Sequence, residues 1–408
     1  MTSVDSLDKN LNWYPWYTGV FHAYFWLPVY FLFFQSMLPL EEVLLLQSVY
    51  FLSVVFMEVP SGWFSDRFGR QKTLVTASLF LTASYILFVS ASSFATFGFA
   101  QFLLAAGIAF NSGTDTSFLF ESCEASGKQE EYAKREAQAT RYSFFGTAIG
   151  AGVGGLISLI DYRGAYMLSV LAGIVLVIIT LSLKEPVKQK DTTKHLSFHK
   201  QVAACVRLLQ DLKLLWLFGF AVLLLIINHI PYEFYQPYIK TLCKMLDAEK
   251  STPIWTSVHL TITTLIASWV AGRSIEFRDA LGTKCVLFIA AGLQIVMMAV
   301  MYLFMSIPTA ILTTLRSCPR ALSTAPLNAA ITPTIPSERR ATFLSLMSLV
   351  GRLGFALTLA VFAIKATEDS WAAMSNMLQI GMWLGIALLT FFAFTSLFIN
   401  IEQSNHQK

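Results

Sequence analysis

Long apolar stretches separated by short polar ones run along the whole chain. A membrane-spanning helix needs about 20 mostly apolar residues, and twelve such stretches lie between charged residues, prolines and glycine clusters. They cover residues 14–36, 43–63, 73–92, 94–120, 138–160, 164–183, 214–237, 253–272, 285–305, 308–330, 341–364 and 371–399. The pattern predicts an all-α membrane protein with twelve transmembrane helices.

The longest hydrophilic stretch lies midway along the chain. It runs from Lys184 to Lys213 and carries seven Lys or Arg residues. Six predicted spans precede it and six follow it. We therefore predict an N-terminal six-helix bundle (1–183), a cytoplasmic linker (184–213) and a C-terminal six-helix bundle (214–408).

The distribution of basic residues predicts how the chain crosses the membrane, because cytoplasmic loops retain Lys and Arg. With the N-terminus inside, the cytoplasmic segments hold 20 of the 29 basic residues, the outer segments 5 and the spans 4. Both termini are therefore expected in the cytoplasm. The polar start of the chain has no signal-peptide pattern, and the compact loops favour a bacterial inner membrane.

Composition argues against several other classes of protein. With 55% hydrophobic and 13% charged residues among 408, the chain has too little polar surface for a soluble domain. A net charge of +4, without a dense basic tract, argues against nucleic-acid binding. The five cysteines lack the spacing of a metal site or a disulfide framework. We expect a monomer without a metal ion or cofactor.

The loop between the second and third predicted spans carries an unusual motif. Residues 62–72 read Gly-Trp-Phe-Ser-Asp-Arg-Phe-Gly-Arg-Gln-Lys. Gly62 allows two helices to approach closely, and Gly69 permits a turn with positive φ. Asp66 can pair with a cation or accept hydrogen bonds from a helix N-terminus. The basic residues are expected to hold the loop on the anionic face of the bilayer: Arg67, Arg70 and Lys72.

This Gly-x-x-x-Asp-Arg-x-Gly-Arg-x-Lys loop, after the second of twelve spans, resembles the signature of the major facilitator superfamily. The resemblance implies two pseudo-symmetric six-helix bundles that rock around a central site. It also implies that the loop latches the two halves together through Gly62, Asp66, Arg67, Gly69 and Arg70. The alternative is an ordinary positively charged loop. A degenerate echo, Gly282-Thr-Lys284, follows span 8, as a duplicated six-helix unit predicts.

The fifth predicted span is rich in glycine, which permits close helix packing and bending. Its glycines resemble the antiporter motif of the same family, although Ala151 stands where a proline is expected. The alternative is a tightly packed helix without a role in export. The residues concerned are Gly146, Gly150, Gly154 and Gly155.

Seven ionisable residues other than histidine fall inside spans, where each costs a few kcal/mol without a partner or a wet surrounding. Glu58, Asp115 and Arg141 lie near the cytoplasmic ends of spans 2, 4 and 5, with Glu121 close by. We expect one ion network, with Arg141 paired to Asp115 or Glu58. It would act as a gate beside the loop motif or, alternatively, as a proton-coupling site.

Three arginines lie deep in the C-terminal half. Arg316 and Arg320 share one face of span 10, and Arg352 lies near the middle of span 11. Guanidinium groups favour bidentate binding of carboxylate or phosphate, so this excess of positive charge indicates an anionic substrate. Alternatively, backbone carbonyls freed at Pro319, or acids such as Glu233, satisfy the arginines.

Span 7 carries several polar residues in its outer half. His229 and Glu233 are i, i+4 neighbours, a spacing suited to proton exchange. The alternative is an isolated histidine whose hydrogen bonds are satisfied locally. Pro231 and Pro237 predict a broken or bent helix. Family resemblance places spans 1, 4, 7 and 10 around the central cavity. The candidate substrate-binding residues from spans 4 and 7 are Asn111, Asn228, His229, Tyr232 and Glu233.

The leading hypothesis is a secondary active transporter that moves a small organic solute, anionic or carboxylate-bearing, by alternating access. No ATP-binding phosphate loop is present, so protons or another driving ion would supply the energy. The expected partners are the substrate, that ion and the lipid bilayer. A proton-coupled multidrug exporter is the close alternative. A non-transporting membrane receptor or scaffold is the alternative from another class, and an enzyme is disfavoured.

Overall fold

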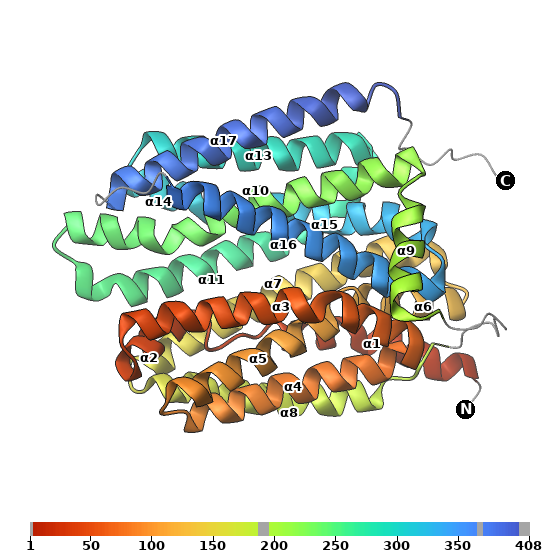
Figure 1. Cartoon of the computed structure of the whole chain (residues 1–408), viewed down its shortest axis with the longest axis horizontal. Helices are drawn as coiled ribbons and strands as arrows, with labels where there is room; N and C mark the ends of the chain where they lie inside the picture. The colour runs from red at the N-terminus through yellow and green to blue at the C-terminus, as the bar shows by residue number, and fades with distance from the viewer. Residues whose placement is uncertain (1–2, 187–195, 365–369, 400–408) are drawn as a thin grey trace.

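The computed structural model describes residues 3–186, 196–364 and 370–399, and in this part of the chain the regular structure is helical (Figure 1). The N-terminal helices are α1 (Ser3–Phe21), α2 (Tyr30–Met37), α3 (Leu40–Phe68), α4 (Arg70–Ser90), α5 (Phe94–Asn111), α6 (Thr114–Ala125), η1 (Gln129–Glu131), α7 (Tyr132–Ser158) and α8 (Tyr162–Ser182). Of the predicted linker, residues 187–195 lie outside the described residues, as does Lys365.

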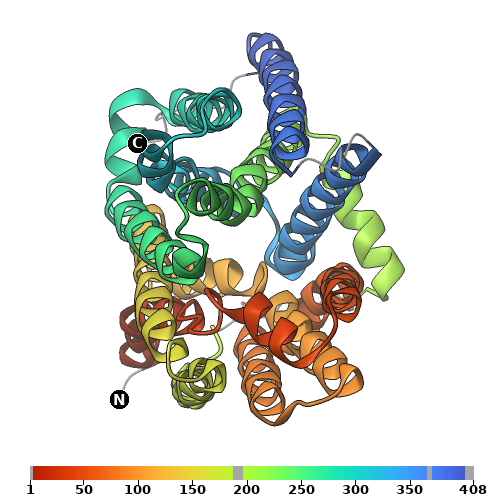
Figure 2. The ribbon, with the colours of Figure 1, turned by 90° about the vertical axis from the view of Figure 1, so that its left-hand side faces the viewer.

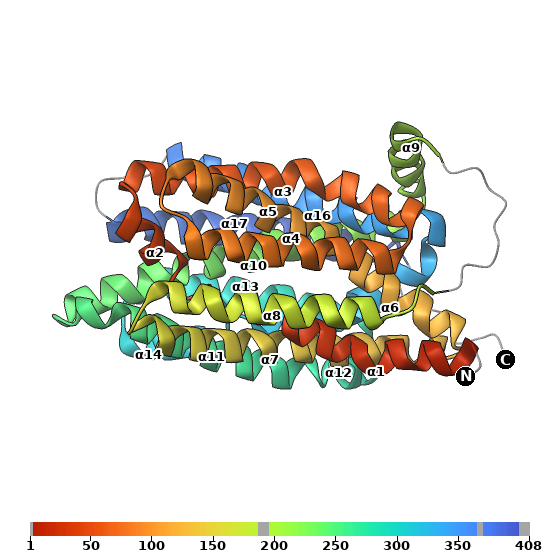
Figure 3. The same cartoon turned by 90° about the horizontal axis from the view of Figure 1, so that it is seen from below.

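Helix α9 (Phe198–Leu208) belongs to the predicted linker and lies across one end of the bundle (Figure 1). The later helices are α10 (Leu212–Met245), η2 (Glu249–Ser251), α11 (Thr252–Ala271), α12 (Ser274–Leu281), α13 (Thr283–Leu303), α14 (Ile307–Leu312), η3 (Thr313–Leu315), α15 (Cys318–Ile331), η4 (Thr332–Thr334), η5 (Ser337–Arg339), α16 (Arg340–Ile364) and α17 (Ser370–Thr395). The start of α1 and the end of α17 lie at the same end as α9 (Figures 1 and 3). We call this end the α9 end.

Two separate hydrophobic cores hold the two halves of the chain. The buried residues of one core run from Leu11 to Leu183, and those of the other run from Cys205 to Phe392. Seen along the helices, residues of the first half and residues of the second half form two groups side by side (Figure 2). Smaller apolar clusters join the halves, where Phe144 and Ala137 of α7 pack against α11, α12 and α15.

Nine helical segments among the described residues are long and apolar enough to cross a membrane. Three of the predicted spans are missing from these nine: 14–36, 138–160 and 308–330. In the structure they correspond to α1 with α2, to the glycine-rich α7, and to α14 with α15. The prediction of an all-α membrane fold is confirmed, and these three segments are its least regular or most polar helices.

The predicted spans 1, 4 and 10 each contain an interruption of the helix. Helix α1 ends at Phe21 and α2 begins at Tyr30, while Gly113, with a φ of +70°, separates α5 from α6. In span 10, α14 passes into η3, and Pro319 lies in the first turn of α15, a position that proline favours. Of the broken or bent helix predicted at the prolines of span 7, the break is absent: α10 runs as one helix through both.

The glycines of α7 lie against the backbone of the first span. A Cβ added at Gly146 would lie 1.9 Å from the carbonyl oxygen of Gly19, and one at Gly154 would lie 1.9 Å from that of Phe25. Gly150 approaches Tyr24 in the same way. Small residues of this kind let helix backbones come close in a membrane. The glycine row therefore fixes α7 against the irregular segment between α1 and α2.

The backbone carries signs of internal repetition. Gly69, between α3 and α4, has φ +107° and ψ 155°, and Gly282, between α12 and α13, has φ +84° and ψ 156°. The echo in the sequence therefore marks a shared turn. Gly127 and Asp247, also with positive φ, each lie in a turn that a 2.8 Å backbone hydrogen bond to a cysteine carbonyl closes. These two turns lie at opposite ends of the bundle (Figure 1), as inverted repeats require.

We expect Gly146→Ala to lower the thermal unfolding midpoint of the detergent-purified protein, because the added methyl group must push α1 and α7 apart. Overpacking of this kind costs about 1–3 kcal/mol. Gly292→Ala is the matched control, since a Cβ there meets nothing within 4 Å and the helix gains up to about 1 kcal/mol. Equal midpoints for the two variants would contradict this packing role.

Candidate functional site

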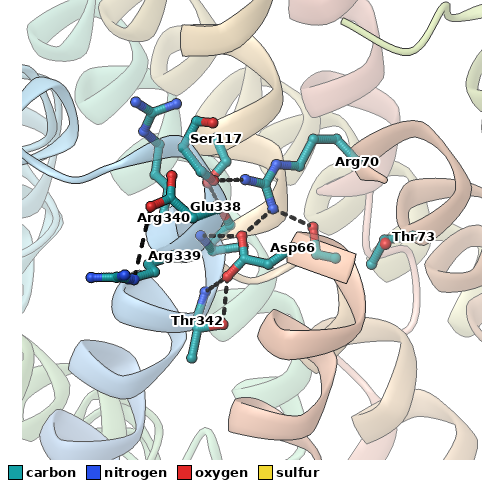
Figure 4. Close-up of polar contacts among 12 residues, drawn as sticks. Asp66, Arg70, Thr73, Ser117, Glu338, Arg339, Arg340 and Thr342 are labelled. Atoms are coloured by element: carbon teal, nitrogen blue, oxygen red, sulfur yellow. Dashed lines mark hydrogen bonds and ion pairs between the residues drawn. The ribbon is translucent and has the colours of Figure 1, made fainter. Parts of the chain in front are cut away.

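A group of buried charges joins the two halves at the α9 end (Figure 4). The Arg70 guanidinium is fully buried; its Nη1 lies 2.5 Å from Asp66 Oδ1 and its Nη2 lies 2.8 Å from Glu121 Oε1. From the other half, Arg340 Nη1 lies 3.0 Å from the same Glu121 oxygen. We call Asp66, Arg70, Glu121 and Arg340 the interlock. Its two cations and two carboxylates balance, which removes most of the cost of burying them.

Asp66 also holds the first turn of α16. Its carboxylate accepts hydrogen bonds from the backbone N–H groups of Ala341 (3.2 Å) and Thr342 (2.9 Å) and from the Thr342 hydroxyl (2.5 Å) (Figure 4). The first N–H groups of a helix lack partners within the helix and favour a negative charge. Gly62 leaves the space for this contact, because a Cβ there would lie 2.9 Å from the Ala341 carbonyl oxygen.

Further polar contacts extend the interlock to the predicted linker. The Glu185 carboxylate accepts the backbone N–H groups of Arg70 and Gln71, both at 2.7 Å, and so caps α4. On α9, Gln201 Nε2 donates to Asp66 Oδ2 (3.3 Å) and to the Glu338 carbonyl (2.5 Å). The predicted linker thus contacts both halves at the α9 end.

Arg70 does not hold the loop on the anionic face of the bilayer, as expected for the three basic residues; it lies between the halves, where the family resemblance implies a latch. Arg70 is fully buried, whereas Arg67 is exposed and its guanidinium lies 5.1 Å from the Trp63 ring centroid. Two carboxylates within reach outweigh the hydration that Arg70 would gain at the surface. The contacts that distinguish the two arginines include tertiary ones, with Glu121 and with the Ser337 carbonyl.

Other hydrogen bonds between the halves lie at the same end. Tyr132 donates to Thr332 (3.1 Å), and Asn328 donates to the buried Glu136 (2.7 Å). Further inward, the Ser345 hydroxyl donates to the Ser112 carbonyl (3.1 Å). Together with the interlock, these contacts close the bundle at the α9 end.

The ion network predicted from Glu58, Asp115 and Arg141 does not form as one cluster. Glu58 Oε2 lies 3.7 Å from Arg352 Nε, and Glu58 also accepts a short hydrogen bond from Ser112. Asp115 accepts from Asn111 Nδ2 (3.1 Å). Arg141 is exposed and runs past Gly272. Its predicted pairing is wrong, because an arginine from the opposite half reaches Glu58 instead.

Arg316 lies at the break between η3 and α15, and its side chain is 3% exposed. Its Nη1 donates to Thr263 Oγ1 (2.7 Å) and to His259 Nδ1 (3.1 Å), both on α11. The Tyr235 ring of α10 covers the guanidinium, with its centroid 3.9 Å from Cζ. Within the described part of the chain, Nε and Nη2 meet no hydrogen-bond acceptor. One complete edge of this buried cation is unpaired.

Arg320 and Arg352 differ from Arg316 in being open to solvent. Arg320 is exposed, with its guanidinium 6.0 Å from the Phe144 ring centroid. Its electrostatic neighbours come from both halves: Tyr232, Tyr24 and Arg352. Arg352 is 27% exposed and has the distant Glu58 as its carboxylate. Arg320 is thus an electrostatic neighbour of Arg352, and it shares Tyr232 as a neighbour with Arg316.

The predicted exchange pair of His229 and Glu233 on α10 is not formed. His229 Nδ1 lies 2.7 Å from the Leu225 carbonyl, and its ring packs against Phe355. Glu233 is exposed. The alternative that the sequence left open, a histidine satisfied within its own helix, agrees with this geometry. Asn228 stays a candidate for substrate contact, because its buried Oδ1 has no partner among the described residues.

Several residues at these contacts were not predicted from the sequence, among them His259, Glu136, Gln201 and Arg340. The one signal for His259 is its position four residues before Thr263 in a span rich in Ser and Thr. Glu136 lies two residues before the predicted start of span 5. For Gln201 the sequence carries no signal, because one amide in a polar linker has no pattern of its own.

Comparison with known proteins settles the family. The sequence profile described as Major Facilitator Superfamily matches residues 17–359 of the chain. The chain belongs to the major facilitator superfamily. It is a multi-pass membrane protein with the fold of a transporter. None of the curated proteins matches the chain in sequence.

Solved structures of major facilitator proteins share the fold at low sequence identity. The E. coli fucose:proton symporter FucP is 14% identical, with a TM-score of 0.71 over 98% of each chain. The nucleoside transporter NupG is 13% identical, with a TM-score of 0.65 over 96% of this chain and 99% of its own. The human organic anion transporter MFSD10 is 14% identical, with a TM-score of 0.70 over 95% of this chain and 100% of its own.

We expect Arg70→Met to destabilise the protein by about 3–5 kcal/mol, because it leaves two buried carboxylates without their shared cation. Arg67→Met is the matched control from the same loop, and for an exposed side chain we expect a change within about 0.5 kcal/mol. Thermal unfolding in detergent compares the two. A midpoint for Arg70→Met as high as that of the control would show that the interlock does not stabilise the fold.

Proposed function

We propose that this member of the major facilitator superfamily is a secondary active transporter for a small organic carboxylate. The observation that carries the proposal is the unpaired edge of Arg316, a buried cation among membrane-spanning helices. Buried donors without acceptors cost about 1–3 kcal/mol each, and more when they are charged. A group held at that cost is a candidate binding site.

The geometry of the unpaired edge favours a carboxylate. Nε and Nη2 point in the same direction from a guanidinium and donate two parallel hydrogen bonds, the arrangement that the two oxygens of a carboxylate accept. The Nη1 group of Arg316 is already used by His259 and Thr263. The bound anion would also meet the field of Arg320 and Arg352.

Aromatic rings around the arginines suggest the rest of the substrate. Tyr235 covers Arg316, Phe144 lies beside Arg320, and the exposed Tyr232 is an electrostatic neighbour of both arginines. A solute with one carboxylate and an apolar or aromatic body would satisfy both kinds of surface. The other proposed substrate contacts are Asn111, Asn228, His229 and Glu233.

Alternating access is the proposed mechanism. The halves 1–183 and 214–408 would rock about the arginines, with the interlock as the latch that closes the α9 end. The excess of basic residues at that end supports a cytoplasmic position for it and for both termini. Glu58 would respond to the opening, since its partners Ser112 and Arg352 come from different halves. Asp115 and Arg141 remain the other proposed gating residues. A monomer in a plasma membrane would suffice.

The fold neighbours support a transport role of this kind. By their titles, they are a fucose:proton symporter, a nucleoside transporter and an organic anion transporter. Their substrates differ, so the anionic substrate proposed for this chain rests on its arginines. A gradient of protons or of another ion would drive the cycle.

We expect benzoate and other carboxylates to raise the thermal unfolding midpoint of the purified protein, and Arg316→Gln to weaken this binding at least about tenfold, as the loss of a charged bidentate contact implies. Arg273→Gln is the control, because Arg273 is exposed and packs on Trp269. The panel also contains acetate, succinate, phosphate and the cation tetraphenylphosphonium. Stabilisation by the cation alone would contradict the proposal.

A further inference from the structure

His259 of α11 has hydrogen bonds that define its protonation state. Its Nε2 lies 3.2 Å from the Ala310 carbonyl oxygen and 3.0 Å from Thr313 Oγ1. A carbonyl oxygen can only accept, so Nε2 carries the hydrogen. Nδ1 faces Arg316 Nη1 at 3.1 Å, and a guanidinium nitrogen can only donate. The imidazole is therefore neutral in this arrangement, with its Nδ1 lone pair directed at Arg316.

The contact with Arg316 prevents His259 from taking up a proton. A proton on Nδ1 would face the N–H of Arg316 across the same 3.1 Å, with two positive charges in a region of low dielectric constant. Protonation therefore requires the guanidinium to move away and a negative charge to come near. A carboxylate bound at Nε and Nη2 would do both.

We infer that His259 takes up one proton for each carboxylate that binds at Arg316, so that the two move together as a symport. This inference rests on the proposed function. In the coupled step the carboxylate accepts hydrogen bonds from Nε and Nη2, and the bond from Nη1 to His259 breaks. A proton from water then binds Nδ1. The resulting N–H donates to Thr263 Oγ1, which already lies 3.5 Å away, or to the carboxylate itself.

The groups around His259 leave it as the proton acceptor of this site. Two titratable or charged groups face the ring among the described residues: Arg316, and Tyr235 of α10, whose ring stacks at 5.6 Å. From α14 and η3 it meets the Ala310 carbonyl and the Thr313 hydroxyl. Helix α7 contacts other positions of α11, through glycines 152 and 155. None of these groups is a carboxylate, so the negative charge must come with the substrate.

The coupling is reciprocal, because two ligands that favour the same state tighten each other's binding by the same factor. If one proton is taken up per anion, the dissociation constant of the carboxylate rises about tenfold for each unit of pH above the range in which His259 is protonated. An inward proton gradient would then drive carboxylate uptake. Each ligand alone would bind more weakly than it does in the presence of the other.

The experiment is isothermal titration calorimetry of benzoate into the purified full-length protein, between pH 6 and pH 8. Benzoate stays ionised over this range. Titrations in buffers of different ionisation enthalpy give the number of protons taken up. We expect about one proton per benzoate in the parent and none in His259→Asn, whose binding constant should change less than about twofold with pH. Asparagine can accept the Arg316 hydrogen bond but cannot take up a proton.

The controls separate this inference from the proposed function. His199→Asn, on the exposed face of α9, should behave like the parent. No benzoate binding by the parent, or equal binding by Arg316→Gln, would overturn the proposed function. Binding that depends on Arg316 but keeps its proton uptake in His259→Asn would overturn the inference alone. So would a folded His259→Asn that fails to bind, and His259→Gln replaces it if it does not fold.

Discussion

A charge inside a membrane protein must find its partner within the protein, because the bilayer supplies none. Arg70 meets this constraint fully, with Asp66 and Glu121 as its carboxylates and Arg340 as the second cation. Since these residues come from both halves, satisfying their charges also closes the α9 end. The same contacts draw the predicted linker into place through Gln201. Electrostatic pairing thus joins the halves at this end, beside the apolar contacts of α7 with α11, α12 and α15.

Arg316 lacks such a partner for its charge, and this difference from Arg70 is the basis for the proposed site. Arg70 has every donor directed at an acceptor, whereas Arg316 has one edge with none among the described residues. Two of the proposed contact residues lie at breaks in the helices: Arg316 follows η3, and Asn111 precedes the break at Gly113. Broken helices in transporters expose backbone and side-chain groups at a binding site. The glycine row of α7 accommodates the third break, beside Tyr24.

Most of the fold could be predicted from the sequence, but the pairing of its charges could not. The period and length of the apolar stretches indicated the helices, and the positive φ expected for Gly69 is present. The positions of Arg67 and Arg70 in one loop could not show that only Arg70 is buried. Depth alone suggested that Arg141 pairs with Asp115 or Glu58, because sequence gives the height of a residue along its helix but not the direction in which it points. Likewise, nothing in the sequence shows that the His259 ring faces Arg316.

The sequence by itself determined the helical membrane fold, the family motif and the presence of three deep arginines. These follow from local properties: about 20 apolar residues fill the bilayer, and a charge in such a stretch is recognisable wherever it lies. Only the tertiary structure decided which charges cancel. Partners such as Asp66 and Thr342, or His259 and Arg316, are far apart in the chain, and hydrogen bonds form only within about 3 Å. Which arginine is satisfied and which has a free edge therefore depends on how the helices pack, rather than on the order of the residues.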